Sequence, residues 1–428
     1  MEMLAVGLLA GVPGSATVQV TASQLFELAQ AAVKRGDDAT ALRAYEALIS
    51  DASQEVRLEA RFRLALLEAK RGNLTQAAIH LRRIIDQRPD ARRARLELAG
   101  ILAKLGDNDG AWRQVRAVQA GGLPPAVARL VDRYSEALRA QRSSGGSIQV
   151  SFVPDSNINR ATRSDTLGTI FGDFQIAQEG KAKSGVGLSL NAQAFRRLPI
   201  GTRNSLLIRA SSAANLYRSS RFNDIAADVA AGPELSLGRD RLQVEIGATQ
   251  RWYGQKLYQR SARVAGIWSH PIGSRTFLRM TGLAALIDNR LNDLEDGKNY
   301  AGSLQLERAF TPTTGIAANL SLNREALRSP GYSTWGWRAG LSGWREMGRM
   351  TLTASAEIGR LHADERLVLF PQRREDHYRR FALGASFRQL QFQGFAPLLR
   401  FSVERNRSSI AFYDYRRTRT ELGVVRAF

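Results

Sequence analysis

The sequence predicts an N-terminal helical solenoid followed by a C-terminal, 14-stranded antiparallel transmembrane β-barrel. Two observations support this fold class. Apolar residues recur with a helical period, in units of similar length, up to residue 142, and they alternate with a period of two from residue 148 to the end. In addition, the connections between the alternating segments are short at one end and long at the other, which is typical of outer-membrane barrels.

The first 20 residues are interpreted as a signal-peptide remnant. Leu4–Val12 form a short apolar run, and Gly14, Ser15 and Ala16 follow as small residues suited to cleavage. The positive segment that normally precedes such a run is missing, since the first basic residue is Lys34. The chain has no cysteine, which excludes disulfides and thiolate metal sites and fits passage through an oxidising compartment.

Residues 21–142 are expected to form a domain of about three helical repeats. Gly72 and Gly106 lie 34 residues apart, and an alanine follows each glycine five residues later. The positions shared between the units are Leu64, Gly72, Ala77 and Pro89, then Leu98, Gly106 and Ala111, with an earlier copy at Gly36, Ala41 and Tyr45. This pattern resembles the tetratricopeptide repeat, in which a glycine turns the chain between two closely packed helices; a generic amphipathic bundle is the alternative.

A joint at residues 143–147 separates the two halves, because Ser143, Ser144, Gly145 and Gly146 favour a flexible segment. Beyond it, residues 148–428 alternate as in "RLQVEIGATQRW", where Leu242, Val244 and Ile246 fall on one face. The expected strands are 147–158, 184–198, 202–217, 223–237, 241–254, 257–271, 275–289, 299–311, 314–328, 332–346, 349–363, 376–390, 394–408 and 414–428. A soluble sandwich or propeller is the alternative, but its strands average about 5–6 residues.

The last strand, in "ELGVVRAF", ends in an aromatic residue. Leu422, Val424 and Phe428 share its lipid-facing side, and Arg426 on the same side is expected to snorkel to the interface. A terminal aromatic also resembles the assembly signal of outer-membrane barrels. Phe428 is therefore expected to be recognised by the barrel assembly machinery.

Five arginines fall opposite the apolar residues of their strands and are candidates for the barrel lumen: Arg209, Arg241, Arg263, Arg338 and Arg400. They could contact a substrate, or they could pair with acidic residues such as Glu245, Glu357 and Glu404. The formal charge of +21 lies mostly after residue 142 and fits a basic channel, anionic lipid or a solvated surface. Nucleic acid is not expected, because the basic residues alternate along strands and do not form one stripe with stacking aromatics.

Neither catalysis nor a metal site or other cofactor is expected. The four histidines, His80, His270, His362 and His377, match no metal-binding spacing. In "VPDSNINRATRSDT", Asp155, Asn157 and Asn159 match the first ligands of a calcium loop. Arg160 and Thr166 stand where that loop needs glycine and glutamate, so a strand end is the better interpretation.

The same stretch carries a family resemblance through Pro154, Asp155, Ser156, Asn157 and Asn159. At the first barrel strand, after helical repeats and before a long loop, it resembles the surface lipoprotein assembly modifier family, in which the role of this motif is unknown. The resemblance implies a periplasmic repeat domain and a barrel in the outer membrane of a Gram-negative bacterium. It also implies export of client proteins, either surface lipoproteins or secreted haem scavengers, with periplasmic chaperones and outer-membrane lipid as further partners.

Two other functions remain open at this point. An exopolysaccharide exporter also joins helical repeats to a barrel, and the basic excess would suit an acidic polymer. A passive porin would have no use for the repeats. No P-loop is present, so movement of a protein client would have to be driven by its folding outside or by handover from chaperones.

Overall fold

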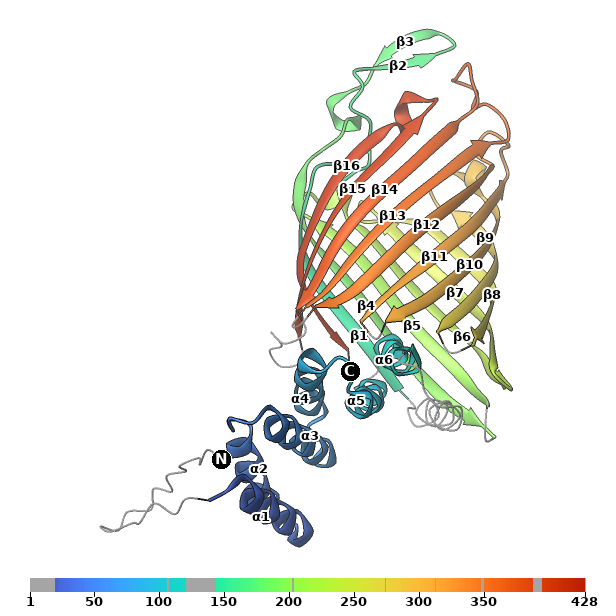
Figure 1. Ribbon diagram of the computed structural model, residues 1–428. Helices are drawn as coiled ribbons and strands as arrows, with labels where there is room; N and C mark the ends of the chain where they lie inside the picture. Colours follow the sequence, from blue (N-terminus) through green and yellow to red (C-terminus); the bar gives the residue numbers. More distant parts are fainter. Residues whose placement is uncertain are drawn as a thin grey trace. The chain divides into compact units, whose positions relative to one another are not determined.

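The computed structural model describes residues 20–105, 108–120, 144–201, 204–273, 275–311, 313–347, 350–387 and 395–427 (Figure 1). The chain separates into two compact units, which divide close to Val118. The first unit is helical and the second is a barrel, as the change of period predicts. None of the helices in the described ranges is long and apolar enough to cross a membrane.

The described part of the first unit is made up of six helices. They are α1 (Ala22–Arg35), α2 (Asp38–Leu48), α3 (Gln54–Lys70), α4 (Leu74–Gln87), α5 (Arg92–Leu105) and α6 (Asn108–Ala120). Thr21 caps the start of α1 with a capping box, in which its side chain accepts a hydrogen bond from the backbone N–H of Gln24 and the Gln24 side chain accepts one from the backbone N–H of Thr21.

The predicted repeat pattern is confirmed by the positions of the turns and of the small residues. Gly36 ends α1 with a φ of 78°, and Gly72 follows α3 with a φ of 85°. Both angles are in the left-handed region, which glycine adopts without strain. Gly106 lies outside the described residues. Ala41 and Ala77, at the same place in the second helix of each pair, are fully buried, and Tyr45 and Leu64 pack in the same core as Ala41. The alanines therefore allow the close helix contacts that a solenoid needs.

The second unit is a closed barrel of 14 antiparallel strands. Its strands are β1 (Ser144–Asp155), β4 (Gly185–Ile200), β5 (Asn204–Tyr217), β6 (Asp224–Leu237), β7 (Asp240–Tyr253), β8 (Lys256–Ile272), β9 (Thr276–Asn289), β10 (Gly297–Thr311), β11 (Thr314–Leu327), β12 (Thr334–Met347), β13 (Met350–Ala363), β14 (Glu375–Phe387), β15 (Ala396–Ser408) and β16 (Tyr415–Ala427). Each strand pairs with its neighbour in sequence, and β16 pairs with β1 to close the barrel. The predicted strand number and order are therefore confirmed.

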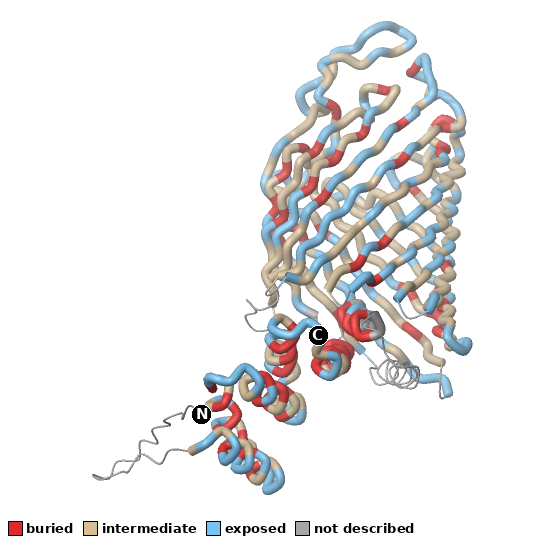
Figure 2. The backbone as a smooth tube through the Cα atoms, viewed as in Figure 1, coloured by how far each residue is buried: buried red, intermediate tan, exposed pale blue. Residues whose placement is uncertain are grey.

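The two faces of each strand differ as a membrane barrel requires. On β4, Leu188 is 52% exposed whereas its neighbour Ser189 is 5% exposed. On β7, Ile246 is 70% exposed and Glu245 is 4% exposed. In Figure 2 the helices carry long buried stretches, while exposed and less exposed residues alternate along the barrel strands. Exposed apolar and sheltered polar side chains are the reverse of a soluble core, so the apolar face is the lipid face.

The connections also follow the predicted asymmetry. Short turns join β4 to β5 and β6 to β7, whereas the other end carries the 29-residue stretch between Asp155 and Gly185 and the loop between Ala363 and Glu375. The first of these loops holds a small hairpin that the sequence did not indicate, made of β2 (Thr166–Thr169) and β3 (Gly172–Gln175). The backbone N–H of Ile170 in this hairpin donates to the carbonyl of Leu369, 3.1 Å away in the other loop.

The expected joint at residues 143–147 differs from the structure over most of its length. Ser144, Gly145, Gly146 and Ser147 belong to β1, where they pair with Arg196, Phe195, Ala194 and Gln193 of β4. Small residues tolerate strand geometry when a neighbouring strand supplies the hydrogen bonds, and local composition does not reveal that neighbour. Ser143 and the predicted signal segment over residues 1–19 lie outside the described residues.

Candidate functional site: the barrel lumen and its closing seam

The five predicted lumen arginines all lie on the inner face of the barrel. The register places Arg209 and Arg263 in one inward row, which also holds Gly247, and Glu245 lies in the adjacent inward row. All of these residues are on the face opposite the exposed apolar residues of their strands. Each of the five has a carboxylate within 4 Å, so the acid-pairing interpretation describes all of them in this structure. Contact with a substrate remains a prediction for each.

The densest of these contacts joins four strands, β5 to β8. Arg209 donates from Nη2 to both carboxylate oxygens of Glu245 at 2.6 Å. Arg263 donates to Glu245 at 2.7 Å and, from Nη2, to Asp228 Oδ1 at 2.8 Å. Because Asp228 is on β6 and Arg263 on β8, this pair spans β7, where Gly247 leaves the space: a Cβ there would lie 3.2 Å from Arg263 Cζ. This bridge therefore links β6 directly to β8 across an intervening strand.

The other three arginines have looser pairs. Arg241 lies 3.5 Å from Glu234, and Arg400 lies 3.5 Å from Glu421. Arg338 lies 3.6 Å from Glu357, and its guanidinium is 4.5 Å from the centre of the Tyr378 ring. Glu404, the third predicted acidic partner, instead faces Arg160 at 3.7 Å and accepts a short hydrogen bond from the Tyr415 hydroxyl.

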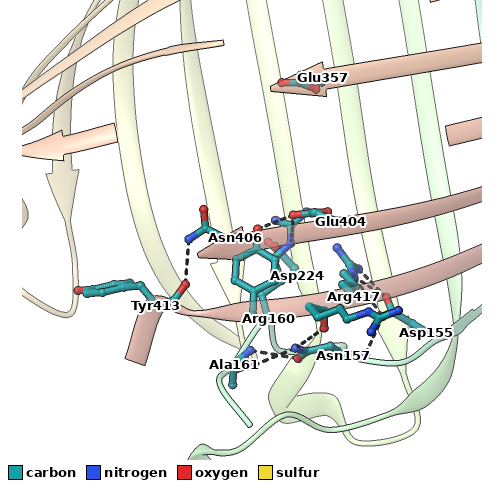
Figure 3. A network of polar contacts seen from close by, with 12 residues as sticks. Asp155, Asn157, Arg160, Ala161, Asp224, Glu357, Glu404, Asn406, Tyr413 and Arg417 are labelled. Atoms are coloured by element: carbon teal, nitrogen blue, oxygen red, sulfur yellow. Dashed lines mark hydrogen bonds and ion pairs between the residues drawn. The ribbon is translucent and has the colours of Figure 1, made fainter. Parts of the chain in front are cut away.

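The family motif lies where β1 meets β16, and we call this contact the seam (Figure 3). Asp155 ends β1, and its side chain is fully buried. Arg417 on β16 donates Nε to Asp155 Oδ2 at 2.9 Å and Nη2 to the same oxygen at 2.5 Å, while its own side chain is 7% exposed. Such a forked, charge-assisted contact holds both strands at a defined register.

The rest of the motif fixes the chain as it leaves β1. Asn157 is fully buried; its amide donates to the carbonyls of Ala161 at 2.8 Å and Arg416 at 3.1 Å, and its side-chain oxygen accepts from Ala161 N–H at 3.0 Å. Ser156 accepts at its Oγ from Thr418 N–H at 2.8 Å. Asn157 and Ser156 therefore extend the attachment of the chain to β16 beyond the end of β1.

Asn159 acts on the other side of the same loop. Its amide donates to the carbonyl of Lys181 at 2.9 Å, and its side-chain oxygen accepts from Lys183 N–H at 3.0 Å. The departing and returning ends of the long loop are thus joined before β4 begins. Pro154 faces outward opposite Val186 of β4, on the lipid side of the strand. In this structure the motif therefore connects the end of β1 to β16 and joins the two ends of the first loop.

These contacts also bear on whether the motif could bind calcium, which was not expected from the sequence. The Asp155 carboxylate is taken up by Arg417, and the side chains of Asn157 and Asn159 bond to backbone groups. Across the described residues, no group of three or more histidine or acidic side chains could hold a metal ion. Two histidines stack on tryptophans of the outer wall, His270 on Trp268 and His362 on Trp335.

Charges on the inner face of the described strands are close to balanced. Inward arginines are Arg197, Arg209, Arg241, Arg251, Arg263, Arg279, Arg338, Arg380, Arg400, Arg417 and Arg419. Inward acids are Asp155, Asp224, Asp228, Glu234, Glu245, Glu307, Glu325, Glu346, Glu357, Asp376, Glu404 and Glu421. The net charge of +21 therefore resides elsewhere on the molecule.

The long loops carry ion pairs of a more exposed kind. A hydrogen bond from Lys181, 2.6 Å away, lowers the pKa of the Asp165 carboxyl. A hydrogen bond from Arg324 likewise lowers the pKa of Asp364, which follows β13.

Phe428, the predicted assembly signal, lies outside the described residues. Arg426, two residues earlier, is exposed on the outer face, 5.4 Å from the centre of the Phe395 ring, as expected for a snorkelling side chain.

A closed antiparallel barrel with an apolar outer wall, a polar lumen and an N-terminal helical repeat unit defines an outer-membrane protein. The family model for the surface lipoprotein assembly modifier matches residues 145–428, and one for a tetratricopeptide repeat-like domain matches residues 12–130. The chain belongs to the surface lipoprotein assembly modifier family.

The chain is similar to several named relatives. Surface lipoprotein assembly modifier 1 of Neisseria meningitidis is 25% identical over 88% of this chain and 77% of its own length. The hemophilin secretion modulator of Acinetobacter baumannii is 21% identical over 80% of this chain and 74% of its own length. Among solved structures, the outer membrane channel DcaP of Acinetobacter baumannii aligns with 67% of this chain and 96% of that chain, at a TM-score of 0.40 and 9% identity.

Sequence reasoning did not identify Arg417, Arg160 or Tyr415 as partners in the seam. Alternation along "YDYRRTRTELG" places Arg417 and Tyr415 on the inward face, opposite Leu422, so this signal was present. The partner of Arg417, however, is Asp155, 262 residues away, and the closing pair of a barrel is set by topology and register.

Proposed function

We propose that this chain is an outer-membrane translocon that moves particular client proteins to the cell surface or into the medium. The single feature that carries the proposal is the union of a helical repeat unit with a closed 14-strand barrel in one chain of this family. The repeats would lie in the periplasm and receive the client, and the barrel would conduct it outward. Periplasmic chaperones would deliver the client, and the barrel assembly machinery would insert the translocon.

The character of the lumen supports a polypeptide as the cargo. The five predicted lumen arginines have acidic partners already, as at Arg209 with Glu245 and Arg263 with Asp228. Ion pairs of this kind leave little free charge to hold a strongly charged polymer, so a chain of mixed composition could pass without being trapped. An acidic exopolysaccharide would be better served by unpaired basic residues along the path.

Relatives point to two kinds of client. The Neisseria protein is named for the assembly of surface lipoproteins, and the Acinetobacter protein for secretion of hemophilin. We therefore infer that the client here is either a surface lipoprotein or a secreted haemophore-like protein. Folding of the client outside the cell, or its handover from periplasmic chaperones, would supply the driving force for its movement.

The test is co-expression with the client encoded beside this gene, followed by detection of the client on intact cells and in the medium. A chain lacking residues 22–142 should still give an assembled, heat-modifiable barrel but export the client poorly. Full export by the barrel alone would show that the repeats are not the receptor. If deletion of this gene removed a surface polysaccharide and affected no protein client, the exopolysaccharide exporter would replace the proposal.

A further inference from the structure

Two rows of basic side chains lie on the outer wall of β13 to β16, close to the long loops. Arg379 of β14 is directly opposite Arg405 of β15, which is directly opposite Arg416 of β16. The next outward row toward the loops holds Arg360 of β13, His377 of β14 and Arg407 of β15, again paired in register. We call these six residues the arginine rows.

The arginine rows face the membrane side of the barrel at the upper limit of its apolar band. Arg379 is paired with Ile358, which is 52% exposed, and is two residues from Phe381, which is 47% exposed on the same outer face. Tyr378 and Arg380, the two neighbours of Arg379 in sequence, face the lumen. Since the long loops of outer-membrane barrels are extracellular, the rows lie at the level of the outer-leaflet head groups.

The charge on this face is not balanced by the protein. Arg405 pairs with Asp414 at 2.7 Å. For Arg360, Arg379, Arg407 and Arg416, no carboxylate of the described residues lies within ion-pairing distance. Glu375, the other acid on this part of the wall, faces His362. On the inner face of the same strands, by contrast, Arg417 and Arg400 both have acidic partners.

Like charges placed directly opposite on neighbouring strands destabilise a sheet. Three successive strands nevertheless place arginines opposite one another at Arg379, Arg405 and Arg416. An anion bound between them would turn this repulsion into attraction. Guanidinium groups bind phosphate through two parallel hydrogen bonds, which makes phosphate the anion that the rows suit best.

We infer that the arginine rows bind the phosphates of a phosphorylated glycolipid in the outer leaflet. Three adjacent strands span roughly 10 Å, and rows two residues apart are separated by roughly 7 Å, enough to hold more than one phosphate. Two exposed apolar residues below the rows are positioned to contact acyl chains: Phe381 lies in the next outward row, and Phe401 lies one row further. A free phosphate would gain nothing from that apolar surface, which favours a lipid as its source.

The experiment measures lipid binding to the full-length protein in a non-ionic detergent. The probes are a bisphosphorylated glycolipid (diphosphoryl lipid A), phosphatidylglycerol and inorganic phosphate. The test variant combines Arg379→Gln with Arg416→Gln, which removes two unpaired charges and leaves the Arg405–Asp414 pair in place. The matched control combines Arg196→Gln with Arg345→Gln, two exposed, outward arginines at the opposite end of the barrel.

We expect the test variant to bind the glycolipid about 10- to 30-fold more weakly, and the control to stay within about twofold of the native protein. Without lipid, the test variant should be at least as resistant to heat as the native protein, because it relieves repulsion. With glycolipid, the native protein should gain heat resistance and the test variant should gain little.

Three results would overturn the inference. Equal weakening in the test and control variants would mean that binding reflects overall charge. A lipid-free test variant that is less stable than the native protein would mean that these arginines serve contacts within the protein. Equal affinity for phosphatidylglycerol or inorganic phosphate would remove the glycolipid as the specific occupant.

Discussion

Replacing Asp155 with asparagine should weaken the barrel more than any change to an exposed ion pair. The substitution keeps the shape of the side chain but removes its charge. Arg417, 7% exposed, then keeps a buried positive charge without the carboxylate that it contacts at 2.9 Å and 2.5 Å. The loss falls at the seam, where the first and last strands must meet for the barrel to close.

The expected cost follows from the burial of the pair. Removing one partner of a buried ion pair typically costs about 3–5 kcal/mol, because the remaining charge is left uncompensated. With a urea dependence of about 3 kcal/mol per M, the midpoint of unfolding should fall by about 1 to 1.7 M. Asp155→Leu combined with Arg417→Met should recover much of this loss, since both charges leave together.

The assay is urea unfolding of the purified protein in detergent, followed by the gel mobility that distinguishes the folded barrel from the unfolded chain. Asp165→Asn is the matched control, because Asp165 forms a 2.6 Å pair with Lys181 while its side chain is 80% exposed. This control should cost at most about 1 kcal/mol. Equal shifts for Asp155→Asn and Asp165→Asn would refute the argument that burial of the seam pair decides its contribution.

Three further predictions concern the other parts of the chain. Burial, with Arg83 and Arg61 nearby, lowers the pKa of His80 to about 4, so the unfolded state takes up its proton first as pH falls. The free energy of unfolding of the helical unit, followed by circular dichroism, should therefore be constant above about pH 6.5 and be lower by about 2 kcal/mol at pH 5. His80→Gln should abolish this dependence on pH. Deleting Phe428 should lower the amount of folded barrel in the membrane; unchanged levels would exclude an assembly signal there. Residues 21–142 expressed alone should be soluble and helical, and a disordered product would mean that the repeats need the barrel.

The fold was accessible from the sequence because it rests on local periodicity. Alternation in "RLQVEIGATQRW" sets the two faces of β7, and the predicted range 241–254 is one residue from Asp240–Tyr253. The repeat turns at Gly36 and Gly72 were equally local, since each needs a left-handed residue after a helix. Where the signal was weak, as in the Ser144–Ser147 segment of β1, strand pairing with β4 decided the structure.

Alternation could place Arg209 and Arg263 in the lumen, yet it could not say that both reach the same carboxylate of Glu245 from different strands. That contact depends on the stagger of β5 to β8, a property of barrel closure and not of any one strand. The same limit applied to the motif: its residue types indicated a strand end, while the partner of Asp155 lies on the last strand.

Closure gives a physical reason for the buried polar contacts at the β1–β16 junction. The other strand pairs of the barrel are joined by a turn or a loop, which holds the neighbouring strands close together before they pair. β1 and β16 have no such connection, so their pairing carries the largest loop-closure entropy in the barrel. A deeply buried fork between Asp155 and Arg417, extended by the backbone contacts of Asn157 and Ser156, supplies specific interactions where chain connectivity supplies none. The motif at the start of the barrel thus supplies specific contacts between its first strand, β1, and its last strand, β16.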